Sequence, residues 1–201
     1  MEELKNVVRT LFSLQTQVHH VVETLNTIGN NYELLRDIKL ENFHVETNLE
    51  ISSHSIISNY SIILFCSFMD EYDFFFNQNH LSSEFQNRIN IVKQKNKPGI
   101  KRIKEWKDLK KFRNQIAAHN FRIKKKSFFS DEFEQFTFKI PNKISEKNLF
   151  SGIIYLLCLN IRNAFPEIKI NSSEVMLDKM KLIGEEVDNE KELEKLIKLM
   201  I

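Results

Sequence analysis

Three polar side chains close together in the sequence combine the charge and the proton chemistry that a reaction on a phosphate ester needs. Arg113 is followed directly by Asn114 and then, after four intervening residues in the run RNQIAAH, by His119. Histidine titrates near neutral pH, so His119 can accept a proton from a hydroxyl group or donate one to a leaving oxygen. Arginine carries a permanent, forked charge that can hold a phosphate, and Asn114 can orient either group. These candidate catalytic residues predict chemistry that needs neither a metal nor another cofactor.

The segment that contains this motif is strongly basic. Between Lys93 and Lys126, 14 basic residues stand against two acidic ones, a net charge of +12, whereas the whole chain carries +2 and the rest of it therefore −10. Such a concentration of positive charge favours a polyanion as partner, and nucleic acid is the natural class. The candidate substrate-binding residues are the basic side chains nearest the motif: Lys110, Lys111, Arg122 and Lys124. The alternative is a solvated face on a helical scaffold that binds no nucleic acid.

Two carboxylates upstream are candidates for supporting the arginine. Asp70 and Glu71 lie in the run MDEYDFFFNQ, where acidic and aromatic residues alternate at the end of a predicted helix. A carboxylate in an aromatic setting can fix a cationic side chain in one orientation. The same pairing can be purely structural, with Arg113 bound to Asp70 or Glu71 and His119 capping a helix.

The motif is predicted to lie late on a helix over residues 100–122. The apolar stripe of that helix contains Ile103, Trp106, Leu109, Phe112 and Ile116. Arg113 and His119 border the stripe on opposite sides, so they are not expected to meet on one helix. A site that uses both is completed most simply by a second copy of the helix across a two-fold axis, which predicts a homodimer.

The run DLKKFRNQIAAHNFR, residues 108–122, resembles the signature of the HEPN superfamily, in which four to six residues separate an arginine, often followed by asparagine, from a histidine; here five residues separate them. The resemblance is sharpest over these residues and extends loosely to the order of helices between about 52 and 165. It implies an all-α domain that dimerises, so that the Arg and His motifs converge at the subunit interface. It also implies a metal-independent endoribonuclease that leaves a 2′,3′-cyclic phosphate and a 5′-hydroxyl.

The resemblance further implies a biological setting. HEPN ribonucleases of this type are similar in acting in phage defence, in abortive infection or as toxins, so RNA and an antitoxin or defence-system partner are the expected partners. In members controlled by a nucleotidyltransferase antitoxin, a tyrosine follows the histidine by two residues, but Phe121 stands at that place here. That mode of control is therefore not expected. The alternative is a catalytically inactive HEPN module that binds RNA, a nucleotide or a partner protein.

The elements that would position these residues are predicted to be helices in a single domain spanning residues 1–201. Four glycines and three prolines are too few for a many-stranded fold, and no two glycines lie close enough to form a phosphate-cradling loop. Apolar residues at steps of three and four predict a long N-terminal helix, either in the core of a bundle or in an intermolecular coiled coil. Further helices are expected at about 31–45, 54–77, 82–94, 144–165 and 172–200. A turn is predicted at 95–99, and a short β-hairpin or loop at 127–141.

Cysteine usage and the chain start indicate a compartment. Cys66 and Cys158 lie in apolar runs and are predicted to be free thiols in the core, which suits a reducing environment. The first residues lack the pattern of a signal peptide, and the longest apolar run, from Ile153 to Leu159, is too short to cross a membrane. A soluble, cytoplasmic protein is expected.

Overall fold

The computed structural model describes residues 2–28, 37–40, 43–46, 53–77, 82–117, 122–123, 126–127 and 137–169, with the backbone alone for the strands. The chain divides into a helical body, residues 1–32 and 52–170, and a second unit, residues 33–51 and 171–201. The predicted terminal helices at about 172–200 lie outside the described residues. The single domain predicted for residues 1–201 stays a prediction.

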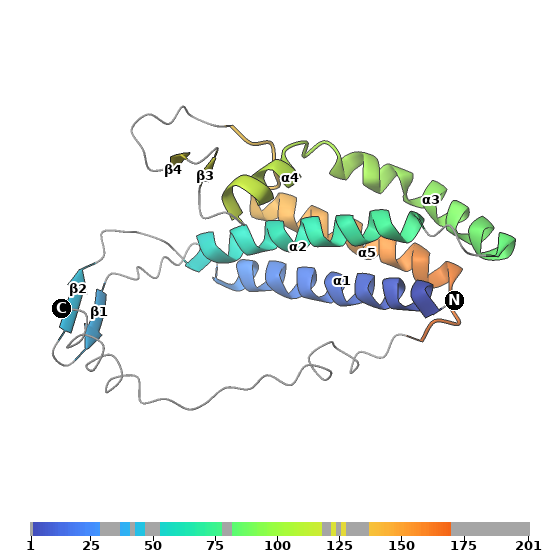
Figure 1. Ribbon diagram of the computed structural model, residues 1–201, viewed down its shortest axis with the longest axis horizontal. Coiled ribbons are helices and arrows are strands. Elements are labelled where there is room, and N and C mark those ends of the chain that lie inside the picture. The colour runs from blue at the N-terminus through green and yellow to red at the C-terminus, as the bar shows by residue number, and fades with distance from the viewer. Residues whose placement is uncertain are drawn as a thin grey trace. The chain divides into compact units, whose positions relative to one another are not determined.

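The helical body is all-α, as predicted. Its described part contains five α-helices, drawn in Figure 1: α1 (Glu2–Ile28), α2 (Ser53–Phe76), α3 (Ser83–Ile103), α4 (Leu109–Phe112) and α5 (Ile144–Ala164). The long N-terminal helix is confirmed, and so are the helices predicted at 54–77 and 144–165. A π-helical turn, η1 (Arg113–Ala117), continues α4.

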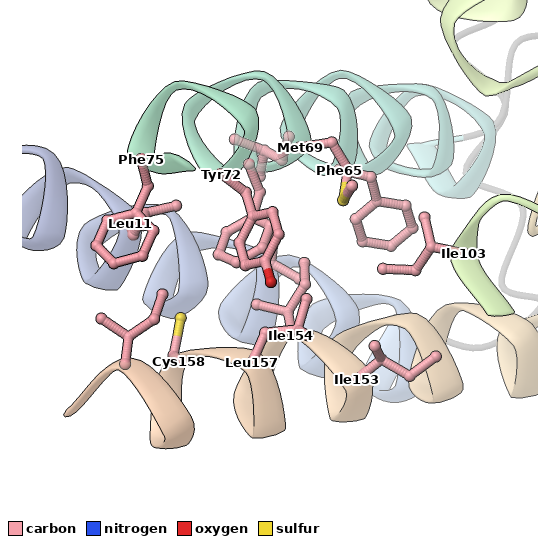
Figure 2. Packing of buried hydrophobic residues seen from close by; sticks show 14 of the residues in the cluster. Leu11, Phe65, Met69, Tyr72, Phe75, Ile103, Ile153, Ile154, Leu157 and Cys158 are labelled. Atoms are coloured by element: carbon pink, nitrogen blue, oxygen red, sulfur yellow. The ribbon is translucent and has the colours of Figure 1, made fainter. Parts of the chain in front are cut away.

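The apolar side of α2 forms the centre of the core. Phe65, Tyr72 and Phe75 project from α2 toward Ile154, Leu157 and Cys158 of α5, as Figure 2 shows. Phe65 stacks on Phe150 with ring centroids 4.1 Å apart. Burial of aromatic rings supplies a large share of the driving force for folding, so this layer holds α2 against α5.

Helix α1 packs against α2 and α5 within the same chain. Its residues Leu4, Leu11, Val18 and Leu25 are all but fully buried. The predicted apolar seam is therefore part of the core of a bundle, and it is not available to an intermolecular coiled coil. Cys66 and Cys158 are buried free thiols, as predicted, and burial raises their pKa values to about 11 and about 12.

The predicted turn at 95–99 is wrong, because α3 runs through it to Ile103 with Pro98 inside the helix. Pro98 is exposed, so the carbonyl that its missing N–H leaves unpaired can bond to water. On the opposite side, buried Asn96 donates to the carbonyl of Leu157 at 3.3 Å and accepts from Asn160 at 2.7 Å. Contacts with α5 thus override the local turn signal.

The predicted single helix over 100–122 is also wrong. Helix α3 ends at Ile103, residues 104–108 form turns, and the chain becomes helical again only at Leu109. Strand β3 (Arg122–Ile123) pairs antiparallel with β4 (Lys126–Ser127), so a short hairpin begins earlier than the predicted 127–141. Residues 137–143 have no regular structure, and residues 128–136 lie outside the described part.

In the second unit, the predicted short helix at 31–45 is replaced by a hairpin. Strand β1 (Asp37–Leu40) pairs antiparallel with β2 (Phe43–Glu46) in a register that places Ile38 opposite Val45 and Leu40 opposite Phe43. Polar residues pair with one another at the alternate positions. Apolar and polar residues that alternate with period two favour a strand over a helix.

The two glycines of α3 and α5 predict opposite responses to substitution. A Cβ atom on Gly99 would lie 3.0 Å from Cγ2 of Ile153 and 3.3 Å from Cδ2 of Leu157, whereas Gly152 has nothing within 4 Å. Gly99→Val is expected to force α3 from α5 and to lower the free energy of unfolding by about 1–3 kcal/mol. Gly152→Ala is expected to raise it by about 0.5–1 kcal/mol, since alanine favours a helix. Urea denaturation checks both, and a Gly99→Val protein as stable as the wild type would contradict the close approach.

Candidate functional site

The turn that leads into the motif is anchored by a buried tryptophan. Trp106 is 3 % exposed, its ring centroid lies 5.4 Å from that of Phe150, and its Nε1 donates to Oε1 of Glu146 at 3.3 Å. The guanidinium of Arg102 lies over the indole, 4.2 Å from its centroid. Trp106 is therefore a core residue, as its place in the apolar stripe predicted, and it fixes where α4 begins.

A second brace comes from the irregular segment 137–143. The backbone N–H of Lys139 donates to Oδ2 of Asp108 at 2.8 Å, and the N–H of Asp108 donates to the carbonyl of Lys139 at 3.3 Å. Lys147, 2 % exposed, donates from Nζ to the carbonyls of Pro141 and Asn142 at 3.1 and 2.8 Å. Burial lowers the pKa of Lys147 to about 8. These bonds tie the start of α4 to α5.

Arg113 forms an ion pair with Asp70 of α2. Its Nη1 lies 2.6 Å from Oδ2 of Asp70, and its Nε donates to Oδ1 of Asn114 at 3.0 Å. Lys110 takes the other oxygen of the same carboxylate, with Nζ 2.8 Å from Oδ1, and lies 3.9 Å from Oδ2 of Asp73. We call Asp70, Asp73, Lys110, Arg113 and Asn114 the Arg113 cluster.

The charges of the cluster shift each other's pKa values. Burial acts to raise the pKa of Asp70, but the hydrogen bonds and charges of Lys110 and Arg113 outweigh it, so this pKa lies below its ordinary value of 3.8. The hydrogen bond to Asp70 raises the pKa values of both Lys110 and Arg113. All three groups are therefore charged at neutral pH, and Arg113 is held in a fixed orientation on the surface of α2.

The π-helical turn changes the geometry that an α-helix would give. Residues Arg113–Ala117 form η1, which packs against α2. Positions predicted by counting residues around an α-helix do not apply to this turn, because a π-helix has more residues per turn. Short π-helical segments occur frequently at functional sites.

The other predicted site residues have different surroundings or lie outside the described residues. Glu71 is half-buried and its pKa is raised by burial, and among the described residues it forms no ion pair with Arg113. Lys111 lies with Nζ 5.3 Å from the centroid of the Phe138 ring. Arg122 begins β3, where only the backbone is described. His119 and Lys124 lie outside the described residues, so the cluster is described without them.

Sequence reasoning missed Asp73 as a partner of Lys110 and did not assign Lys110 a structural role. The spacing carried a signal, because Asp70 and Asp73 lie three residues apart and therefore share one side of α2. It also missed a row of lysines along α3, which the wrongly predicted turn at 95–99 interrupts.

The described part of the chain shows neither a metal-binding cluster nor a membrane-spanning helix. Its His, Cys, Asp and Glu side chains form no group of three that could hold a metal ion. None of its helices is both long enough and apolar enough to cross a membrane.

A double-mutant cycle tests whether Asp70 fixes Arg113. Asp70→Asn and Arg113→Gln, singly and together, are expected to show a coupling of about 0.5–1 kcal/mol in the free energy of unfolding at pH 7, modest because 44 % of the Asp70 side chain is exposed. A lowered carboxyl pKa gives stability that is present above the ordinary pKa of 3.8 and lost as pH falls further, so the coupling should disappear in acid.

The matched control is Asp73→Asn, which removes a neighbouring carboxylate that contacts Lys110. Its coupling to Arg113 should be close to zero. If Asp70 and Asp73 couple equally to Arg113, or if Asp70 does not couple to it, a specific pair of Asp70 with Arg113 is contradicted.

The described site is an ion-pair cluster on the surface of an all-α body, fixed by α2 on one side and by the brace to α5 on the other. No family model, no curated protein and no solved structure matches this chain. The function is therefore inferred from the residues themselves.

Proposed function

We propose that this protein is a metal-independent endoribonuclease of HEPN type. Arg113 would bind the reacting phosphate, and His119 would transfer the proton of the 2′-hydroxyl or of the 5′-oxygen leaving group. Asn114 would orient the arginine. A role in phage defence or as a toxin follows from the same resemblance of the sequence run 108–122.

The observation that carries the proposal is the fixed orientation of Arg113. Its Nη1 and Nε are bound by Asp70 at 2.6 Å and by Asn114 at 3.0 Å, while 24 % of its side chain stays exposed. A guanidinium that is already oriented loses little freedom when it binds a phosphate, which is how a charged group contributes most to a transition state. Asp70 is thus proposed as the supporting acid.

The same contacts favour a second candidate, a catalytically inactive HEPN module. Asp70 and Asp73 offset the two positive charges of Lys110 and Arg113, which weakens the local attraction for a phosphate. In that case the Arg113 cluster would hold α4 on α2, and the protein would bind RNA, a nucleotide or a partner protein without cleaving it.

A homodimer is part of the proposal, because His119 is expected to meet the arginine of a second copy. Helix α2 offers a surface for it: Ile56, Tyr60 and Phe74 are 50 %, 47 % and 45 % exposed. At about 100° per residue, Ile56 and Phe74 share one direction, and Asp70 lies about 40° from it. Phe74 lies about 6 Å from Asp70 along the axis of α2, and Tyr60 and Ile56 lie about 15 and 21 Å from it in the other direction. An interface along this side of α2 would therefore extend to the Arg113 cluster.

Cleavage of RNA in the presence of EDTA tests the proposal. Wild-type protein should cut total RNA or transfer RNA and leave 2′,3′-cyclic phosphate ends. His119→Ala should lower the rate about 10²- to 10⁴-fold, the usual contribution of a general acid or base. Arg113→Ala should lower it about 10²- to 10³-fold, as for the loss of one transition-state contact.

The control is Arg162→Ala, since Arg162 is exposed on α5 and is also followed by asparagine but not by a histidine. It should retain the full rate. No cleavage by wild type, with RNA binding that survives Arg113→Ala and His119→Ala, would replace the enzyme by the binding module. No binding of RNA at low salt would exclude both the ribonuclease and the RNA-binding module.

Charged substitutions test the α2 surface. Ile56→Glu with Tyr60→Glu should convert the dimer to a monomer in sedimentation experiments, because two carboxylates would be buried in the interface. Tyr155→Glu with Leu156→Glu is the matched control, since these α5 side chains are equally exposed, at 56 % and 57 %. If only the α5 substitutions dissociate the dimer, its interface does not lie on α2. A monomeric wild-type protein would refute the dimer.

A further inference from the structure

Four lysines lie along one flank of α3. Lys93, Lys97, Lys101 and Lys104 follow one another at intervals of four, four and three residues, and all four are exposed. Because an α-helix rises about 1.5 Å per residue, the row extends over about 16 Å. We call these four residues the lysine flank. It becomes a continuous row only because α3 runs through 95–99 as a helix.

The packing of α3 fixes which way this flank faces. Ile89, Val92, Asn96 and Ile103 are buried, and Gly99 lies against Ile153 and Leu157 of α5. Counted around the helix, the lysine flank lies about 110° from the centre of this buried side. Helix α3 cannot rotate to hide the lysines without breaking its contact with α5.

The lysine flank has no acidic partners among the described residues. The ion pairs of α3 are formed by Arg88 with Glu84 and Glu167, and by Arg102 with Glu105. Within the same described part, Lys93 of the flank contacts an aromatic ring, since its Nζ lies 5.9 Å from the centroid of the Phe76 ring. The arginines of α3 are thus compensated and the lysines are not.

A row of uncompensated like charges is unfavourable for the helix that carries it. Lysines at i and i+4 repel each other, and the described part of the chain offers this row no carboxylates. The repulsion is relieved when an extended anion with regularly spaced charges lies along the helix, and releasing counterions from that anion adds further driving force.

We propose that the lysine flank binds the phosphate backbone of single-stranded RNA and leads it toward Arg113. The proposal rests on the proposed function for the identity of the polyanion as RNA. The row ends at Lys104, the C-cap of α3, and the chain then passes through residues 105–108 into α4 and Arg113. Lys110 is already bound by Asp70, so the flank supplies the positive charge that the Arg113 cluster lacks.

The arrangement in one row favours a single strand. A duplex is recognised by contacts across its grooves with both strands, whereas a single strand is followed along one backbone by one line of positive charge. In Figure 1, α3 extends as one nearly straight rod that ends beside α4, so the row has a single direction.

The salt dependence of binding tests the proposal. The full chain carrying His119→Ala, which keeps the RNA intact, is titrated with a labelled single-stranded RNA of about 16 nucleotides, the upper end of the usual site size. Replacing all four lysines of the flank by glutamine should weaken binding at least about tenfold at low salt. It should also reduce the slope of log affinity against log salt by about 3, since each phosphate contact on a single strand contributes about 0.7.

The matched control removes four other exposed charges: Lys95→Gln, Lys139→Gln, Arg162→Gln and Lys169→Gln. Its net charge equals that of the flank variant, and Lys95 lies on the opposite side of the same helix. The control should keep the wild-type slope. An equal loss of slope in both variants, or a loss in neither, would overturn the proposal. Binding of a duplex of the same sequence as tightly as the single strand would overturn the assignment to single strands.

The two proposals fail separately. If wild-type protein cleaves RNA but the flank variant keeps the wild-type salt slope, the proposed role of the lysine flank is wrong and the proposed ribonuclease activity is supported. If no cleavage occurs but the slope falls as expected, the flank stands as an RNA-binding surface and the catalytic proposal fails. Circular dichroism of both variants checks that α3 remains folded.

Discussion

The described body depends on the burial of one side of α2 against α1 and α5. Phe65, Phe68 and Phe75 are fully buried, and Phe65 stacks on Phe150 of α5. Because these rings leave α2 no freedom to rotate, the opposite side of the helix must face away from the core. That outer side carries Asp70, so the same packing that stabilises the body also fixes the carboxylate that holds Arg113.

Two independent supports position the basic region. Helix α3 is fixed by its close approach to α5 at Gly99, and α4 is fixed by Trp106, by the bonds between Asp108 and Lys139, and by Asp70. Among the residues that the structure describes, acidic side chains offset the charges of the Arg113 cluster but not those of the lysine flank. The molecule thus separates an oriented arginine from a row of free positive charge, an arrangement suited to a site that binds a long anion and acts on it at one place.

The sequence allowed the long helices and a carboxylate partner for Arg113, either Asp70 or Glu71, to be predicted, because both follow from patterns that survive packing. An apolar seam over many turns predicts α1, and an acid near aromatic residues predicted a partner for Arg113. Glu71 was not separable from Asp70 by sequence, since only the rotation of α2 decides which of two neighbouring carboxylates faces the arginine. The helix through 95–99 depends on contacts of Asn96 and Gly99 with α5, which local turn signals do not contain. The turn at 104–108 is likewise held by a tertiary bond, between Asp108 and Lys139, and the π-helical turn packs against α2.

We propose that Arg113 of one copy and His119 of another act on the same RNA phosphate. Mixing subunits tests it most directly: the inactive variants Arg113→Ala and His119→Ala are unfolded together, refolded as a mixture and assayed for RNA cleavage in EDTA. A mixed dimer contains one intact arginine and one intact histidine on different subunits, so activity is expected to return above that of either variant alone. Mixed dimers that form but remain inactive would contradict it.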